Sequence, residues 1–247
     1  MKNENVRKLR EMRLPVFAST YLEQMEHPEK YAQMTFDERM ALMVDREFES
    51  RNSNRIRRML RKSNLPLSKA SIADIAYLPE RHLDRGLIDH LATNEFIVKK
   101  RNLIVLGATG AGKTYLSNAI AADACRAGFH VLYVRLPDFF VEYSNAIAQH
   151  KEFEILKAYQ KAELLVIDEF LLLPATEPQQ RTLLELLERR YGRSSTIFCS
   201  QYNLDGWHEQ LGGSAIADSI LDRITPNAYK IVIQGDVSMR QRLSADD

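Results

Sequence analysis

The fold is decided by one stretch near the middle of the chain, where Asn102-Leu103-Ile104-Val105-Leu106 runs directly into Gly107-Ala108-Thr109-Gly110-Ala111-Gly112-Lys113-Thr114. The first run is mostly apolar and is typical of a strand buried on both faces. The second fits the pattern G-x-x-x-x-G-K-[ST], and a helical pattern follows from Thr114 to Ala127. Its small residues let successive backbone N–H groups turn toward one anion at a helix N-terminus. This order of elements therefore predicts a phosphate-binding loop.

The loop and a later acidic pair predict a site for ATP and Mg²⁺. All eight residues of Gly107–Thr114 are expected to contact the nucleotide, with Lys113 at the β- and γ-phosphates and the Thr114 hydroxyl on Mg²⁺. Downstream, the apolar run 164–167 ends in Asp168 and Glu169. Ligands gather at the carboxyl ends of strands in open α/β sheets, so we expect Asp168 to hold Mg²⁺ and Glu169 to polarise the attacking water. The second acid favours hydrolysis over a P-loop kinase, which must exclude water.

The chain after residue 100 alternates short apolar runs with helical stretches. The runs typical of strands are 102–106, 131–135, 164–167 and 195–200, with 230–233 as an edge strand. Helical patterns fall between them at 114–127, 137–149 and 177–191. Such alternation predicts an α/β fold, a doubly wound parallel sheet with helices on both faces. We expect this ATPase domain to cover 71–247, after a small all-helical domain over 1–70 for DNA binding and self-association.

The N-terminal part carries the chain's basic surplus. Residues 1–101 hold 20 Lys+Arg and 15 Asp+Glu, whereas the remainder holds 14 and 18, so a net charge of +1 hides a basic first part and an acidic second part. Thr35 to Glu38 predicts a capping box that opens a helix. No acid occurs between Glu49 and Asp74, and the cations there that fall on one amphipathic helix are Arg51, Arg55, Arg57, Arg58, Arg61 and Lys62.

These six cations predict sequence-independent contacts with the phosphate backbone of double-stranded DNA. No Phe, Tyr or Trp lies among them, so stacking on the bases of a single strand is not supported. A solvated helix face, a coiled-coil or dimer interface, and a surface for a transposase are the alternatives.

Composition excludes other classes of protein. The chain has 247 residues, of which 45% are hydrophobic and 27% charged, as in soluble globular proteins rather than disordered ones. No apolar run approaches the ~20 residues that span a bilayer, and no apolar signal segment is seen at the N-terminus. Cys125 and Cys199 lie in apolar surroundings without metal-ligand spacing. We therefore expect a cytoplasmic protein with buried, reduced thiols and no membrane partner.

Four further polar residues are candidates for the hydrolytic step. Gln201 follows the strand 195–200 and can orient the attacking water, with Asn203 as the second choice; a polar strand-end cap is the alternative. Arg223 ends a helical run and has the fixed charge and forked geometry of an arginine finger supplied by a neighbouring subunit. A surface pair with Asp222 is its alternative. Arg240 is a comparable candidate.

Together these motifs resemble the IstB-type transposition helper ATPases, relatives of the DnaC helicase loaders and DnaA initiators in the AAA+ superfamily. The resemblance covers nearly the whole chain. It rests on the phosphate loop, the acidic pair, and the strand end at 199–201 with Trp207 after it. It also rests on the pair 222–223, the ending 235–240 and the N-terminal runs 9–15 and 36–39, together with the Arg-rich helix.

The resemblance implies a regulator of a transposase that self-assembles with ATP on duplex DNA, stimulates strand transfer and is released by hydrolysis. It implies active sites at subunit interfaces, Arg223 as the trans-acting finger, Arg240 as a second sensor, and nucleoid association when DNA is bound. It also implies a helical insertion near 137–149 that contacts DNA. The family usually has Asn at the position of Gln201 and an aromatic residue at that of Met239, so we expect slower or differently regulated turnover.

The motifs are also compatible with three rival functions. A DnaC-like replicative helicase loader is also an ATP-dependent partner of DNA, although loaders prefer single strands. A P-loop kinase acting on a small molecule is disfavoured by the Asp168-Glu169 pair. A scaffold that binds ATP without hydrolysing it is the third alternative, and phosphate release stimulated by DNA would exclude it.

Overall fold

The structure, a computed structural model, describes residues 2–235 and divides into two units between Arg58 and Met59. The boundary falls inside one helix, α3 (Phe36–Lys62), rather than near residue 70 where the sequence placed it. This helix has 27 residues and contains neither glycine nor proline, so nothing in its sequence interrupts it. The basic stretch is therefore the second part of a longer helix.

The N-terminal unit is helical, as predicted. It contains α1 (Lys2–Glu11), α2 (Pro15–Glu26), the 3₁₀ turn η1 (Pro28–Tyr31) and most of α3. The predicted capping box opens α3: the amide of Thr35 donates to Glu38 Oε2 at 2.7 Å, and the amide of Glu38 donates to Thr35 Oγ1 at 3.3 Å. These two bonds satisfy backbone donors that the first turn of a helix leaves unpaired.

A buried carboxylate joins α2 to α3. Glu47 Oε2 accepts hydrogen bonds from the amides of Val16 and Phe17 in the first turn of α2, both at 2.9 Å. Its other oxygen accepts from Arg51 Nε at 2.7 Å, and Arg51 also donates to the carbonyl of Arg13. Burial alone would raise the pKa of Glu47, but these hydrogen bonds bring it below its ordinary value. Arg51, predicted to bind DNA, thus has a partner inside this unit.

The second unit contains a five-stranded parallel sheet with the order β2-β3-β4-β1-β5. Its strands are β1 (Leu103–Gly107), β2 (Val131–Arg135), β3 (Leu164–Asp168), β4 (Ser195–Ser200) and β5 (Tyr229–Ile233). Before the sheet come the 3₁₀ turns η2 (Ile72–Asp74) and η3 (Pro79–Arg81) and the helices α4 (Arg85–Ala92) and α5 (Glu95–Val98). The later helices are α6 (Lys113–Arg126), α7 (Leu136–Ala148), α8 (Glu152–Lys161), α9 (Glu177–Arg190), α10 (Leu204–Gln210) and α11 (Ala215–Ile224).

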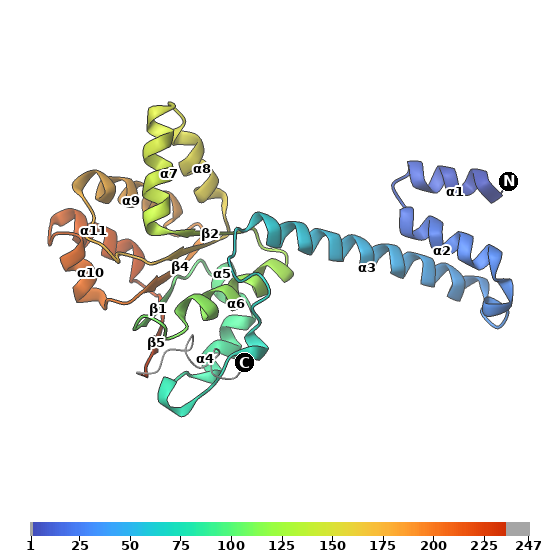
Figure 1. Cartoon of the computed structure of the whole chain (residues 1–247), viewed down its shortest axis with the longest axis horizontal. Helices are drawn as coiled ribbons and strands as arrows, with labels where there is room; N and C mark the ends of the chain where they lie inside the picture. Colours follow the sequence, from blue (N-terminus) through green and yellow to red (C-terminus); the bar gives the residue numbers. More distant parts are fainter. Residues whose placement is uncertain (1, 236–247) are drawn as a thin grey trace. The chain divides into compact units, whose positions relative to one another are not determined.

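Helices cover both faces of the sheet (Figure 1). Leu103 and Val105 of β1 pack into one core with α4, α5 and α6, whereas Ile104 and Leu106 pack into the other with α7 to α11. Successive side chains of a strand point to opposite faces of the sheet, so a strand buried on both faces has to be apolar throughout, as β1 is. The predicted doubly wound α/β fold is confirmed, including β5 as an edge strand.

Local predictions differ from the structure at a few helices. The short run after residue 70 forms only the 3₁₀ turn η2, and no helical pattern was predicted where α8 forms. Helix α8 buries Leu156 and Tyr159 against the core, a contact that requires the neighbouring α7 and α9. Both cysteines are buried and free, as expected. Among residues 2–235, no helix is both long and apolar enough to cross a membrane.

We predict that Glu47→Gln weakens the N-terminal unit by about 1–3 kcal/mol, because a neutral amide replaces a buried acceptor of charge-assisted hydrogen bonds. Faster hydrogen exchange at the amides of Val16 and Phe17 would report the change. The lowered pKa means that wild-type stability is present above the ordinary pKa of 4.5 and is lost as the pH falls through the folded-state value. Glu49→Gln, on an exposed side chain, is the control; equal exchange in both variants would contradict the assignment.

Candidate active site

The phosphate loop connects the end of β1 to the first residue of α6, as the sequence predicts. Gly110 and Gly112 have φ values of 83° and 94°, in the left-handed region that favours glycine, and Gly112 is the N-cap of α6. At Gly107 a Cβ atom would lie 2.8 Å from the carbonyl oxygen of Ile233 in β5, so only glycine fits. The loop therefore depends on all three glycines, and its backbone leads directly into a helix N-terminus.

Lys113 lies over this loop. Its Nζ donates to the carbonyls of Gly107 at 2.8 Å and Ala108 at 2.9 Å. Across the loop, Thr109 Oγ1 donates to Gln201 Oε1 at 3.1 Å. Gln201, which follows β4, is thus brought to the loop, while Asn203 caps α10 by accepting from the amide of Gly206 at 2.9 Å. Of these two candidates, only the glutamine has a contact with the loop.

Asp168 is the most closely held side chain at this edge of the sheet. One of its oxygens, Oδ2, accepts from Thr114 Oγ1 at 2.8 Å and from Tyr133 Oη at 3.0 Å. The other accepts from the amide of Glu169 at 2.8 Å. The side chains predicted to hold Mg²⁺ are therefore in contact, at the carboxyl end of β3 and the start of α6.

This oxygen pair fits a magnesium ion that shares its coordination with a nucleotide. Mg²⁺ is usually held by one or two protein oxygens plus phosphate oxygens and water, rather than by a cage of several carboxylates. Thr114 and Asp168 supply that small set. Within the described part of the chain, no group of three or more His, Cys, Asp or Glu side chains is placed to hold a metal on its own.

Tyr133, which comes from the edge strand β2, is a site residue that no sequence motif predicts. Burial raises the pKa of its hydroxyl, and the neighbouring Asp168 raises it further, so the hydroxyl stays protonated and acts as a donor. Its amide donates to the carbonyl of Ser63 at 2.8 Å. The contact between Tyr133 and Asp168 follows from the strand order, because β2 lies beside β3 although α7 and α8 separate the two strands in sequence.

Glu169 forms an ion pair that the sequence did not predict. Arg135 Nη2 lies 2.6 Å from Glu169 Oε2, with both side chains partly exposed. The pairing follows from the register, in which Arg135 at the end of β2 lies opposite Asp168. Bonding to this carboxylate raises the pKa of Arg135, which keeps the pair charged. Glu169 itself has a φ of 51°, a left-handed conformation that turns the chain sharply after β3.

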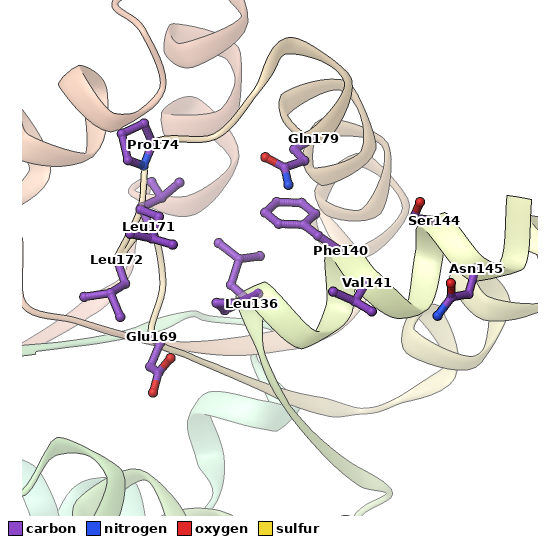
Figure 2. Close-up of a pocket in the computed structure, with 12 residues that line it drawn as sticks. Leu136, Phe140, Val141, Ser144, Asn145, Glu169, Leu171, Leu172, Pro174 and Gln179 are labelled. Atoms are coloured by element: carbon purple, nitrogen blue, oxygen red, sulfur yellow. The ribbon is translucent and has the colours of Figure 1, made fainter.

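A hollow of about 470 Å³ flanks Glu169. Its walls come from the first turns of α7 and from the segment 171–174, with Phe140 and Leu171 among the apolar side chains. Figure 2 shows the Glu169 carboxylate at one end of the hollow, turned away from these side chains. The acid therefore points out of the apolar hollow.

Arg223 lies at the opposite end of the sheet from the loop. The side chain of Asn102, just before β1, donates to the carbonyls of Arg223 at 3.3 Å and Ile224 at 3.0 Å. Strand β1 has five residues, so its ends are roughly 15 Å apart. The Arg223 guanidinium bonds to Glu188 of α9 and, at 3.0 Å, to the carbonyl of Ser219. Arg223 is thus not part of its own chain's loop site, and Arg240 lies outside the described residues.

The predicted DNA-binding side chains are all exposed along α3. Arg51 is the one of the six with an ion pair, to Glu47. The others form no ion pair with a described residue: Arg55, Arg57, Arg58, Arg61 and Lys62.

We predict that Tyr133→Phe raises the Mg²⁺ concentration needed for tight nucleotide binding by about tenfold, because Asp168 loses a hydroxyl donor that fixes its orientation. Titrating Mg²⁺ against a fluorescent ATP analogue measures this shift, and binding without metal should be unchanged. Tyr115→Phe is the control, since Tyr115 adjoins Thr114 in sequence but has no hydrogen bond to Asp168. Equal Mg²⁺ dependence in both variants would remove Tyr133 from the site.

The chain is similar to known proteins over most of its length. The family model of the IstB-like ATP binding protein matches residues 7–246. The insertion sequence ATP-binding protein y4pL of Sinorhizobium fredii is 34% identical over 235 residues, 95% of each chain. The ATP-binding protein named for insertion sequence IS1162 of Pseudomonas fluorescens is 32% identical over 201 residues, 81% of this chain and 87% of that one.

Solved structures agree on the fold. The replication initiator DnaA bound to AMPPCP and single-stranded DNA aligns with a TM-score of 0.59 at 18% identity, over 74% of this chain and 55% of the DnaA chain. At this identity the likeness shows a shared AAA+ fold and no more. The match of the family model over nearly the whole length is the stronger result: the chain belongs to the IstB-like ATP binding proteins of IS21-type insertion sequences.

Proposed function

We propose that this protein is an ATPase that assembles on duplex DNA, recruits and stimulates the transposase of its insertion sequence, and leaves the DNA when ATP is hydrolysed. The observation that carries the proposal is the contact of Thr114 with Asp168 beside the phosphate loop, with Glu169 next in the chain. Together these residues supply phosphate binding, metal binding and a general base. Membership of an insertion-sequence family supports the link to transposition.

In this mechanism the loop amides and Lys113 bind the phosphates of ATP. Thr114 and Asp168 would hold Mg²⁺, which when bound neutralises charge on the β- and γ-phosphates. Tyr133 keeps the Asp168 carboxylate oriented. Glu169 takes the proton of the attacking water at a carboxylate oxygen, and Gln201 orients that water from the end of β4.

Arg135 must release Glu169 before the acid can act as a base. The Glu169 oxygen that accepts a hydrogen bond from the Arg135 guanidinium at 2.6 Å is engaged, so it is not free to bond to the attacking water. The ion pair is partly exposed and therefore weak, so Arg135 can exchange Glu169 for a water molecule or a nucleotide oxygen. Hydrolysis would therefore be slow in the free chain.

The site also needs a group from another chain. Arg223 is roughly a strand's length from its own loop, and the charge that develops on a transferring phosphoryl group calls for a fixed cation. We assign Arg223 to the nucleotide of a neighbouring copy in the assembly. Arg240, as a second sensor, remains part of the proposal.

Duplex DNA is the proposed partner of α3. Five of its cations are exposed without a carboxylate partner among the described residues. No Phe, Tyr or Trp that could stack on a base occurs within 51–62. A helicase loader of DnaC type would instead favour single strands. Comparing affinities for the two forms of DNA separates these functions.

We predict that Glu169→Gln lowers ATP hydrolysis by at least a hundredfold while ATP binding is kept, because only the general base is lost. The variant should remain on duplex DNA with ATP under conditions in which the wild type dissociates. Phosphate release and DNA retention are measured on the same samples. Glu209→Gln, an exposed acid elsewhere, should behave as wild type. Wild-type turnover by Glu169→Gln would refute the role of the acid.

We also predict that replacing Arg55, Arg57 or Arg58 by Ala weakens duplex binding similarly for all sequences. Each lost phosphate contact should reduce the slope of log affinity against log salt by about 0.9. Arg7→Ala, on an exposed arginine of α1 that pairs with Glu11, serves as the control. An unchanged salt slope in the α3 variants would show that this helix face does not bind DNA.

A further inference from the structure

A second hollow, of about 380 Å³, lies at the end of the sheet opposite the phosphate loop. It is lined by the segment Lys99–Asn102 before β1, by the end of α9 with the turn that follows, and by the end of α11. Arg223 is one of the lining residues. The group assigned to a neighbour's nucleotide therefore lies at the edge of a concave surface rather than on a flat one.

The lining of this hollow is strongly basic. It includes five cationic residues and no Asp or Glu: Lys99, Lys100, Arg101, Arg190 and Arg223. Two of them form ion pairs with acids that do not line the hollow: Lys99 with Glu95 at 2.6 Å, and Arg223 with Glu188. Lys100 and Arg101 form no ion pair with a described residue, and Arg101 instead lies over the ring of Tyr229.

Arg190 adds a fixed charge beneath the surface. Its side chain is almost fully buried, and it donates to main-chain carbonyls, including those of Tyr159 at 2.6 Å and Ala162 at 2.8 Å. Burial lowers the pKa of Arg190 to about 9, so the guanidinium remains charged at neutral pH. No carboxylate of the described chain pairs with it, and the hollow is correspondingly attractive to an anion.

The backbone holds Lys100 in an unusual conformation. Its φ of 57° is left-handed, and the bonds from Lys100 N to Ile97 O and from Arg101 N to Phe96 O end helix α5 in a tight turn. Glycine is the residue that such a helix end favours, since the left-handed conformation is strained for a residue with a Cβ atom. A lysine at this point gives up stability and keeps a cation on the rim of the hollow.

The two ends of the sheet would be complementary in charge once ATP is bound. The loop end would hold the triphosphate beside Asp168, whereas the opposite end carries the basic hollow. Opposite charges on different surfaces of one chain favour head-to-tail contacts between copies, rather than a two-fold symmetric dimer. We propose that the hollow receives the nucleotide edge of a second copy of this chain, and that Lys100 and Arg101 act beside Arg223 as further trans contacts to its phosphates.

This inference rests on the proposed trans action of Arg223, and it adds the surface and two residues. Lys100 supplies a mobile point charge and Arg101 a forked donor, two complementary ways of binding phosphate oxygens. The Arg223–Glu188 pair is exposed enough to open when a stronger anion arrives. Arg223 would then exchange Glu188 of its own chain for a phosphate of the neighbouring chain.

The test uses full-length chains in mixed assemblies. Lys100→Gly removes the ammonium and supplies the residue that the turn favours, so the fold should be at least as stable. Glu169→Gln chains lack the base but keep an intact hollow. We expect Lys100→Gly alone to hydrolyse ATP at least tenfold more slowly than wild type. Adding an equal amount of Glu169→Gln should raise the rate per Lys100→Gly chain severalfold, whereas the double variant Lys100→Gly/Glu169→Gln should give no rise.

Two further measurements identify the ligand. Sedimentation with a non-hydrolysable ATP analogue should show weaker assembly for Lys100→Gly and for Arg101→Ala, independently of turnover. Lys151→Ala, an exposed lysine outside the hollow, should assemble and hydrolyse as wild type. Duplex affinity of the chain without nucleotide should not change in Lys100→Gly.

Other outcomes would overturn the inference. If Lys100→Gly and Arg101→Ala hydrolyse and assemble as wild type while Arg223→Ala is slow, the trans surface is limited to Arg223 and the proposed function stands. A slow Lys100→Gly that Glu169→Gln chains do not restore would place the lysine in its own site. Loss of duplex affinity alone would make the hollow a DNA contact. Wild-type rates in Arg223→Ala would refute the proposal that neighbouring chains share an active site.

Discussion

The hydrogen bonds to the Asp168 carboxylate connect the parts of the site. Thr114 donates from the first turn of α6, Tyr133 from the edge strand β2, and the amide of Glu169 from the turn after β3. Three elements distant in sequence therefore meet at one acid that is almost fully buried. A buried charge is stable only when its oxygens are satisfied, so this network fixes the orientation of the proposed magnesium ligand and the position of Glu169.

The parallel sheet gives the molecule two chemically different ends. Every strand ends at the loop side, where the acids lie, and every strand begins at the side where Arg223 and the basic hollow lie. One chain cannot bring these ends together, because the strands that separate them are rigid. Under the proposed function, this separation makes hydrolysis a property of the assembly. The ion pair between Arg135 and Glu169 would also slow hydrolysis in the isolated chain, because it engages the proposed base.

The sequence predicted what depends on local pattern. The loop Gly107–Thr114, the strands and the acids at the end of β3 follow from spacing that can be read along the chain. The partners Tyr133 and Arg135 could not be predicted, since they require β2 to lie beside β3. Arg51 was assigned to DNA on its charge alone, whereas its contact with Glu47 depends on the packing of α2 against α3. Charge patterns cannot distinguish a free cation from one held within the fold.

Under the proposed function, each active site is completed by a neighbouring chain. The most direct measurement is the rate of ATP hydrolysis per chain, with duplex DNA present, across protein concentrations over which sedimentation shows single chains passing to assemblies. We expect a rate per chain that is near zero for single chains and rises steeply as assemblies form. A rate per chain that stays constant across this range would contradict it.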